Sequence, residues 1–219
     1  MESNRVSVIG RLHGDLKAFH SAADVEMLYD GTIVVQRLSG TMDFLHFLIP
    51  ATVATRCGYT NPSDFMAHPL RMMGSIQTYS RLVDGKKRHY IILKVDHVED
   101  ALGSRDDNRV TLVGKISRPP VYRETPFGRE VCEFMVAVER SRRRNDYIPC
   151  IAWGDNARYV GAMEEGQIVE LAGRFQSREY VKTLENGEKE TRTAYEVSAK
   201  TVCTHEVEKR LITEPEKEK

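Results

Sequence analysis

Large apolar residues recur at every second position in much of the second half of the chain. Between Glu130 and Glu139 the apolar set is Cys132, Phe134, Val136 and Val138. Successive side chains of a strand point to opposite faces, so this period of two is typical of a strand with one buried face. The pattern predicts a helix at Asn156–Met163, between the third and fourth of five strands at Arg109–Ile116, Glu130–Glu139, Asp146–Trp153, Gln167–Tyr180 and Ala194–Val202.

The chain also contains an internal repeat. Asn4 to Leu12 reads NRVSVIGRL and Asn108 to Ile116 reads NRVTLVGKI, with four identities in nine positions. Further along, Gly74 to Gln77 (GSIQ) recurs as Gly173 to Gln176 (GRFQ). The sequence therefore indicates two copies of one unit of about 100 residues.

Each copy is expected to form one barrel. Five strands with a helix between the third and fourth is the element order of the OB-fold, so we expect an all-β chain of two tandem five-stranded OB-fold barrels. The polar segment Glu99–Asp107 is typical of a linker, and Tyr180–Arg192 predicts a hairpin that projects from its barrel. The expected domains are residues 1–103 (a divergent OB-fold), 104–203 (a second OB-fold) and 204–219 (a charged, disordered tail).

Overall charge gives no sign of a broadly basic nucleic-acid binder. The 32 Lys and Arg residues balance 32 Asp and Glu residues, with a pI of about 7.1. Any nucleic-acid binding must then come from local clusters of charge. The sequence has no apolar run of about 18 residues, and MESNRVSV has no signal-peptide pattern. We therefore expect a cytoplasmic protein that does not contact a membrane.

Residue types with catalytic or metal-binding chemistry form no known motif. Cys57, Cys132, Cys150 and Cys203 lack C-x-x-C spacing, which favours reduced packing thiols. The seven histidines show no zinc-site spacing, and there is no P-loop, G-x-S-x-G or H-E-x-x-H motif. We predict no catalytic residue, metal, cofactor or small-molecule substrate.

Aromatic and arginine side chains interleave on one face of the segment from Tyr147 to Tyr180. Tyr147 and Trp153 share one side of their strand, and Arg174 and Arg178 share one side of theirs with Tyr180. A lone tryptophan often packs in a core, but its shared side with Tyr147 favours an exposed role. Rings interleaved with arginines are typical of a platform for single-stranded nucleic acid.

The second copy resembles the bacterial single-stranded DNA-binding protein family. The resemblance rests on motifs in consistent order from Asn108 to about Val202: NRVTLVGKI, VYRETPFG, FMVAVERS, IAWGDNARYV and GQIVELAGRFQSREY. It implies an OB barrel, an assembly that presents four barrels, and single-stranded DNA held by stacking rings and basic side chains. With two barrels in each chain, it implies a homodimer.

Carried onto this chain, the resemblance implies particular contact residues. Stacking is expected on Tyr147, Trp153 and Tyr180. Phosphate contacts are expected from Lys115, Arg123, Arg142, Arg143, Arg144, Arg174 and Arg178. The implied function is to coat or protect single-stranded DNA, largely without sequence preference, in replication, recombination or repair.

Two other classes of function remain open. An OB-fold protein that binds RNA or belongs to a primosome would use the same rings. A protein-interaction scaffold that binds no nucleic acid is favoured by the neutral net charge. Two departures from the family pattern also stand out. Pro149 removes a hydrogen-bond donor from the third strand, which is then expected to be bulged or at an edge, and the tail lacks an acidic stretch with a hydrophobic tip.

The two copies are not expected to bind equally. A constant offset of 99 residues is taken from the recurrence of Ile49 and Pro50 as Ile148 and Pro149 and from the GSIQ and GRFQ motifs. It pairs Tyr147 with Leu48, Trp153 with Ala54 and Tyr180 with Arg81. On that alignment the first copy has no ring at these positions. It is then predicted to bind DNA poorly and to serve in assembly or partner binding.

Overall fold

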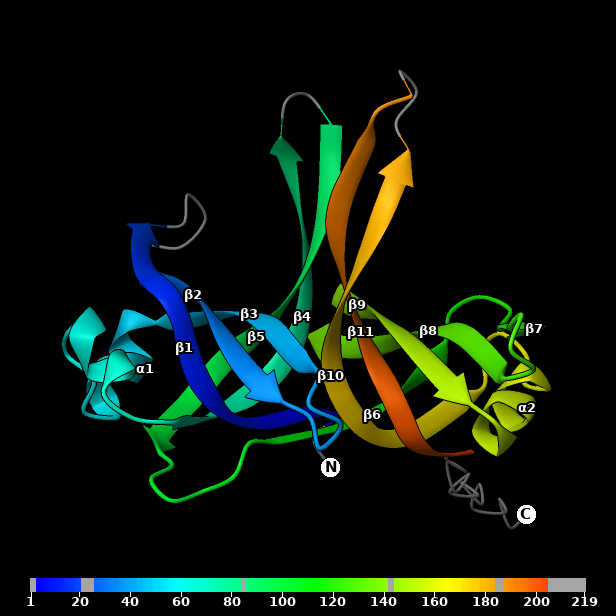
Figure 1. The fold of residues 1–219 in the computed structure, drawn as a ribbon, viewed down its shortest axis with the longest axis horizontal. Helices are drawn as coiled ribbons and strands as arrows, with labels where there is room; N and C mark the ends of the chain where they lie inside the picture. The colour runs from blue at the N-terminus through cyan, green and yellow to red at the C-terminus, as the bar shows by residue number, and fades with distance from the viewer. Residues whose placement is uncertain (1–2, 21–25, 84–85, 142–143, 184–186, 205–219) are drawn as a thin grey trace, which may run out of the picture.

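The computed structural model describes residues 3–20, 26–83, 86–141, 144–183 and 187–204. The elements of the first half are β1 (Asn4–His20), β2 (Met27–Gln36), β3 (Met42–Pro50), α1 (Ala51–Arg56), the 3-10 helix η1 (Pro62–Met66), β4 (Leu70–Val83) and β5 (Lys86–Asp100). Those of the second half are β6 (Asp107–Ile116), β7 (Val121–Glu124), β8 (Glu130–Ser141), β9 (Arg144–Trp153), α2 (Asp155–Gly161), β10 (Ile168–Thr183) and β11 (Lys189–Thr204). Figure 1 shows the two halves side by side.

Each half closes on itself as a barrel. In the first, β1 pairs with both β2 and β4, and β3 and β5 complete the circuit. In the second, β6 pairs with both β8 and β10, and β9 and β11 complete the circuit. The prediction of two tandem five-stranded OB-fold barrels, each with a helix between its third and fourth strands, is confirmed for the described part of the chain.

The expected elements of the second half are present, with some differences at their ends. The short strand β7 was not predicted, because its four residues are all exposed and lack an apolar period. Thr204, assigned to the tail, ends β11, and residues 205–219 lie outside the described part of the chain. Residues 101–106 connect β5 to β6. The domain boundaries at 103 and 203 stay a prediction.

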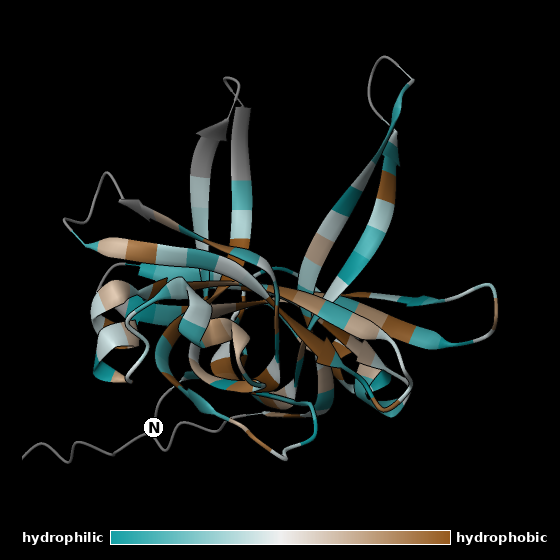
Figure 2. Cartoon of the chain, turned by 60° about the vertical axis from the view of Figure 1, so that its left-hand side comes forward, coloured by the Kyte–Doolittle hydropathy of each residue, from teal (hydrophilic) through white to brown (hydrophobic). Residues whose placement is uncertain are grey.

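Burial follows the alternation of the sequence. Cys132, Phe134, Val136 and Val138 are at most 2% exposed and face the interior of the second barrel. Hydrophobic positions concentrate in the barrel strands, and the two hairpins β4–β5 and β10–β11 extend beyond the barrels as arms (Figure 1). The coloured part of the β10–β11 arm is mostly hydrophilic (Figure 2). The second of these arms is the projecting hairpin that the sequence predicts. No helix among the described residues combines the length and hydrophobicity needed to cross a membrane.

The glycine of the GSIQ and GRFQ motifs lies at a β-bulge in both copies. The register of β4 with β5 shifts between Met73 and Gly74, and that of β10 with β11 shifts between Ala172 and Gly173. A Cβ on Gly74 would lie 2.0 Å from the carbonyl oxygen of Lys94, and Gly173 is equally crowded by Ser198. The motif repeats because only glycine fits where the two backbones approach this closely.

The asparagine that starts the other repeated motif forms two hydrogen bonds with the backbone of another strand in its own barrel. Asn4 donates from Nδ2 to the carbonyl oxygen of Ile76 (2.7 Å) and accepts at Oδ1 from its N–H (3.0 Å). Asn108 does the same to Phe175, at 2.6 and 2.9 Å. Both asparagines satisfy a donor and an acceptor of the strand backbone. This role explains why the residue recurs.

The two barrels join through antiparallel pairing of β1 with β6. The pairing runs from Asn4 opposite Leu112 to Ile9 opposite Asp107, and Val6 lies opposite Val110 near its centre. Corresponding strands of the two copies thus pair with each other in opposite directions, and each uses the same surface. The copies are related by an approximate two-fold rotation through this junction.

The strand pairing corrects the alignment of the two copies. Phe47 of β3 pairs with Leu93 of β5, as Cys150 of β9 pairs with Val197 of β11. The shift is therefore 103 residues between β3 and β9 and 104 residues between β5 and β11. The shift of 99 holds only in β4 and β10, where Gly74 corresponds to Gly173. The first copy has four more residues between these positions of β3 and β4 than the second copy has between those of β9 and β10, and the extra residues lie in the segment that contains η1. The expected pairs of Tyr147 with Leu48 and Trp153 with Ala54 are therefore wrong: Tyr147 corresponds to Phe44, and Trp153 to Pro50.

Candidate nucleic-acid interface

A groove of about 910 Å³ reaches from β3 of the first barrel to the β7–β8 hairpin of the second. Its lining from the second barrel includes Arg123, Arg129, Glu133, Ile151, Trp153, Arg174, Gln176, Arg178, Glu179 and Glu196. Its lining from the first barrel includes Arg37, Met42 and Phe44. We call this feature the Trp153 groove. It brings together four of the predicted contact residues: Trp153, Arg123, Arg174 and Arg178.

Trp153 is the last residue of β9 and lies opposite Val131 of β8. Its side chain is 41% exposed, while its neighbour Ala152 is fully buried. The guanidinium carbon of Arg129 lies 5.6 Å from the centroid of the indole ring, within the range of a cation–π contact. Trp153 thus presents a ring to the groove.

The groove carries an excess of positive charge in a chain with a net charge of +0. Its described lining residues include five arginines and three glutamates, and Arg37 is also paired with the buried Asp43, so one positive charge is in excess. The Trp153 groove is therefore a local basic cluster of the kind that a chain without net charge needs in order to attract phosphate.

Arg174 is the arginine of this groove that has a buried nitrogen without a hydrogen-bond partner among the described residues. Its Nη2 donates to Oε1 of Gln176 at 3.1 Å, whereas its Nε is buried without a hydrogen-bond partner among the described residues. Burial lowers the pKa of Arg174, and the nearby charge of Arg37 lowers it further. A buried donor without an acceptor is costly. A phosphate oxygen would supply both an acceptor and a compensating negative charge.

Arg178 connects the groove to the β10–β11 arm. Its Nε lies 3.7 Å from Oε1 of Glu196, whose same oxygen accepts a 2.7 Å hydrogen bond from Gln176. The guanidinium carbon of Arg178 lies 6.0 Å from the ring centroid of Tyr180, which is 38% exposed. Tyr180 does not line the groove itself. It lies two residues further along β10.

Tyr147 and Lys115 form a second cluster away from the groove. On the outer face of β6, β8 and β9, Lys115 pairs with Ala137, which pairs with Tyr147. Tyr147 is 53% exposed and precedes Trp153 by six residues, a span of about 20 Å along a strand. Arg144 starts the same strand and is exposed. The structure therefore divides the platform expected from the sequence into two groups of rings, and Arg142 and Arg143 lie outside the described residues.

Three residues of the groove were missed by the sequence reasoning: Arg37, Phe44 and Arg129. The sequence contains a signal for two of them, Arg37 and Phe44. Arg37 precedes Asp43 and Phe44 with the same spacing by which Arg140 precedes Asp146 and Tyr147. Aligning these segments gives the shift of 103 residues. The first copy therefore retains an exposed ring at the Tyr147 position, and the expectation that it has lost all three rings is wrong.

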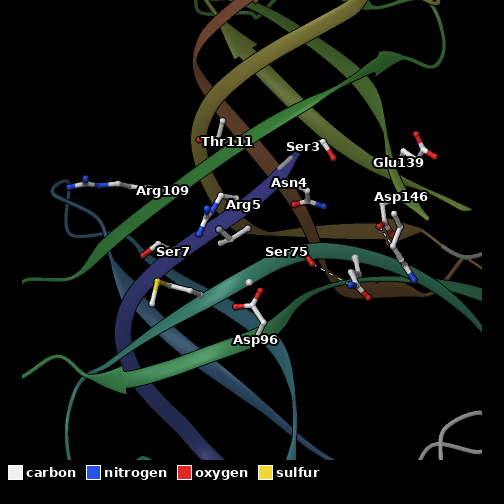
Figure 3. Close-up of a pocket in the computed structure, with 15 residues that line it drawn as sticks. Ser3, Asn4, Arg5, Ser7, Ser75, Asp96, Arg109, Thr111, Glu139 and Asp146 are labelled. Atoms are coloured by element: carbon white, nitrogen blue, oxygen red, sulfur yellow. Dashed lines mark hydrogen bonds and ion pairs between the residues drawn. The ribbon is translucent and has the colours of Figure 1, made fainter. Parts of the chain in front are cut away.

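A second hollow, of about 620 Å³, lies at the junction of β1 and β6. Figure 3 shows it lined by polar side chains, among them Arg5, Ser7, Arg109 and Asp96. Its lining contains no aromatic ring. Among the described residues it offers no aromatic ring on which a base can stack, so the Trp153 groove is the better candidate for nucleic acid.

Among the described residues, no group of three or more His, Cys, Asp and Glu side chains is placed to hold a metal ion. Cys132 and Cys150 are buried, and burial raises the pKa of both thiols, that of Cys132 to about 11. They are packing residues of the second barrel.

Comparison with known proteins agrees with this geometry. Residues 107–204 match the model of the single-strand binding protein family. The single-stranded DNA-binding protein of Halalkalibacterium halodurans is 38% identical over 80 residues, covering 33% of this chain and 48% of that protein. The single-stranded DNA-binding protein A of Bacillus subtilis is 36% identical over 80 residues, covering 33% of this chain and 46% of that protein. The matches thus span about half the length of these relatives.

The fold of the whole chain is similar to a solved structure. The crystal structure of the wild-type single-stranded DNA binding protein from Thermus aquaticus aligns with a TM-score of 0.73, covering 93% of both chains at 18% identity. At this identity the likeness concerns the fold. The resemblance inferred from the motifs is confirmed, since residues 107–204, which include the second barrel, are similar to the single-strand binding protein family.

Proposed function

We propose that this protein binds single-stranded DNA in the Trp153 groove, largely without sequence preference and without catalysing a reaction. The observation that carries the proposal is the placement of the exposed Trp153 ring among five arginines contributed by both barrels. Every base has a ring face, so stacking on an indole tolerates any sequence. Arginines that track the phosphates add affinity that falls as the salt concentration rises.

The arrangement of the groove suggests a path for the strand. A base stacks on Trp153 while Arg174 and Arg178 contact phosphates, and Tyr180 receives a further base where β10 leaves the barrel. Arg123 is held by Glu133 at 2.8 Å and borders the other end. Each stacked base contributes about 1–3 kcal/mol to binding.

Tyr147, Lys115 and Arg144 contribute to a longer path. They lie on the outer face of the second barrel, where a strand that extends beyond the groove meets another exposed ring and a cation. The expected contribution of these residues therefore depends on the length of the DNA. Arg142 and Arg143 directly precede Arg144 in the sequence, and we expect them to contact phosphates of the same longer strand.

Two chains are proposed to associate into a homodimer with four barrels. The support is the family resemblance, in which four barrels act together, and the presence of two barrels in this chain. Sedimentation is expected to give about twice the chain mass of 25.0 kDa. A monomer at micromolar concentration would contradict this. We expect the protein to act in the cytoplasm, where it would bind single-stranded DNA.

The test is a titration of the full chain against fluorescently labelled oligo(dT), matched oligo(rU) and duplex DNA at two salt concentrations. We expect tight binding to oligo(dT), a lower affinity at the higher salt, and weak binding to the duplex. Stronger binding to the RNA would favour the RNA-binding alternative. No binding to any of the three would favour a protein-interaction scaffold.

A further inference from the structure

Phe127 is the most exposed aromatic side chain among the large hydrophobic residues of the described chain, at 91%. It lies in the turn between β7 and β8, within the segment Thr125–Arg129. The proposed contacts above leave it without a role. A phenyl ring left in water forgoes the free energy that contact with an apolar partner would supply, so its position relative to the groove is informative.

The turn that carries Phe127 is well defined. The N–H of Gly128 donates to the carbonyl oxygen of Thr125 at 2.9 Å, and the N–H of Thr125 donates to that of Arg129 at 2.8 Å. The N–H of Arg129 also donates to Oγ1 of Thr125 at 3.0 Å. Pro126 restricts the backbone before the ring, and Gly128 supplies the positive φ of 71° that the turn requires. The ring is therefore presented by a pre-organised backbone.

The hairpin is also fixed to the body of the second barrel. Tyr122 of β7 donates to Oε1 of Glu130 at 2.6 Å, and Glu130 forms an ion pair with Arg158 of α2. Gly161 of α2 lies against Tyr122, because a Cβ there would meet the Cβ of Tyr122 at 3.0 Å. Figure 1 shows β7 beside α2 at the outer end of the barrel. These contacts hold the turn in place relative to Trp153.

The residues on either side of the turn line the Trp153 groove. Arg123 and Arg129 are both among its lining, and Arg129 lies over the indole of Trp153 at 5.6 Å. Phe127 is not itself a lining residue, but it is two residues from Arg129, whose guanidinium contacts the Trp153 ring, and this places it next to the rim of the groove. Bases suit an exposed ring flanked by arginines, since each nucleotide brings a π-face together with a phosphate.

We propose that Phe127 is a further stacking ring, which receives the base next to the one held on Trp153 as the DNA strand passes the rim. This inference rests on the proposed function. The strand is then held between the β7–β8 turn and Trp153 at one end of the groove and reaches Arg37 and Phe44 at the other. The Phe127 ring then contacts a nucleobase of single-stranded DNA. The tests below distinguish this from contact with a protein partner.

The first test compares the affinities of full-length variants for labelled oligo(dT) of about 16 nucleotides, at the upper end of the site size of one OB-fold. Phe127→Ala is expected to weaken binding about fivefold to tenfold, at the lower end of a single stacking contact. Leu102→Ala is the matched control, because Leu102 is also an exposed apolar residue (65%) but lies in the connection between the barrels. It should bind as the wild type does.

The second test moves the only tryptophan to the rim. In a Trp153→Phe background, Phe127→Trp is expected to lose fluorescence when oligo(dT) binds, and Leu102→Trp in the same background is expected to keep it. Binding is confirmed separately by anisotropy of the labelled DNA. This readout does not depend on the affinity of Phe127→Ala or on how that variant folds.

The possible results separate the two proposals. Unchanged fluorescence at position 127 and unchanged affinity of Phe127→Ala, while the wild type binds DNA, would overturn the role of Phe127 and leave the Trp153 groove intact. A change in sedimentation mass of Phe127→Ala without loss of DNA affinity would assign the ring to a protein contact and overturn the inference as well. Failure of the wild type to bind DNA would overturn both proposals.

Discussion

Asp43 of the first barrel accepts a hydrogen bond at Oδ1 from the backbone N–H of Ser177 in the second barrel, at 3.0 Å. Ser177 in turn accepts at Oγ a 2.8 Å bond from the N–H of Phe44. The approximate two-fold places Asp146 and Thr78 in the same relationship, with a 2.6 Å bond from the N–H of Thr78. Each barrel thus contributes a buried aspartate that holds a strand of the other barrel beside it.

Replacing Asp43 with alanine should destabilise the protein. Arg37 donates two hydrogen bonds to Asp43, at 2.8 and 2.6 Å, and Asp43 is fully buried. Removal of the carboxylate leaves the charge of Arg37 uncompensated and the N–H of Ser177 without an acceptor. We expect a loss of about 3–5 kcal/mol in the free energy of unfolding, measured by urea denaturation. The exposed Asp96→Ala serves as the control and should change stability by less than about 0.5 kcal/mol.

Phe44→Ala should weaken DNA binding although Phe44 belongs to the first barrel. Its ring is 40% exposed and lines the Trp153 groove. A tenfold loss of affinity, about 1.4 kcal/mol, is expected in an equilibrium titration with oligo(dT). Affinity equal to that of the wild type would mean that the strand does not reach the first barrel, as the sequence alignment at a constant offset had suggested.

Arg174→Gln should reduce both the affinity for DNA and its dependence on salt. If Arg174 neutralises one phosphate of the single strand, the slope of log K against log [salt] should become shallower by about 0.7. The measurement is a salt series of titrations with oligo(dT). Arg109→Gln is the control, because the Arg109 side chain is 80% exposed outside the Trp153 groove. Equal slopes for the two variants would contradict a phosphate contact at Arg174.

The four cysteines should differ in their reaction with a thiol reagent at neutral pH. Cys203 is exposed and Cys57 half-buried, whereas Cys132 and Cys150 are buried. Burial raises the pKa of Cys132 to about 11 and raises that of Cys150 further, so both stay protonated and shielded. Mass spectrometry after labelling the folded protein should find the label on Cys203 and Cys57. Rapid labelling of Cys150 would show that the second barrel opens more readily than its packing implies.

The sequence predicted most of the fold because its signals are local. Period-two alternation identified the buried faces of the strands, and the repeated glycines and asparagines marked positions that the backbone of each barrel requires. The alignment of the copies failed where the segment containing η1 lengthens the first copy, since a single offset cannot absorb an insertion. The strand contacts of β3 and β9 were needed to find it.

The candidate site was only partly predictable, for a different reason. Trp153, Arg123, Arg174 and Arg178 could be chosen from residue type and strand face. The contribution of Phe44 depends on its contact with β10, and it is 133 residues from Ser177 in the chain. Nothing in local periodicity shows such a contact. The separation of Tyr147 from the groove likewise depends on the path of β9, which begins beside the first barrel, where Asp146 binds Thr78.

The central claim is that a base of single-stranded DNA stacks on Trp153 in the groove. Trp153 is the only tryptophan in the chain, so intrinsic fluorescence reports on this site alone. Titration of the wild-type protein with unlabelled oligo(dT), with binding verified independently by sedimentation, should quench the fluorescence and saturate at the stoichiometry of binding. The same titration without any change in fluorescence, at saturating and verified binding, would show that the DNA does not contact Trp153 and would contradict the account.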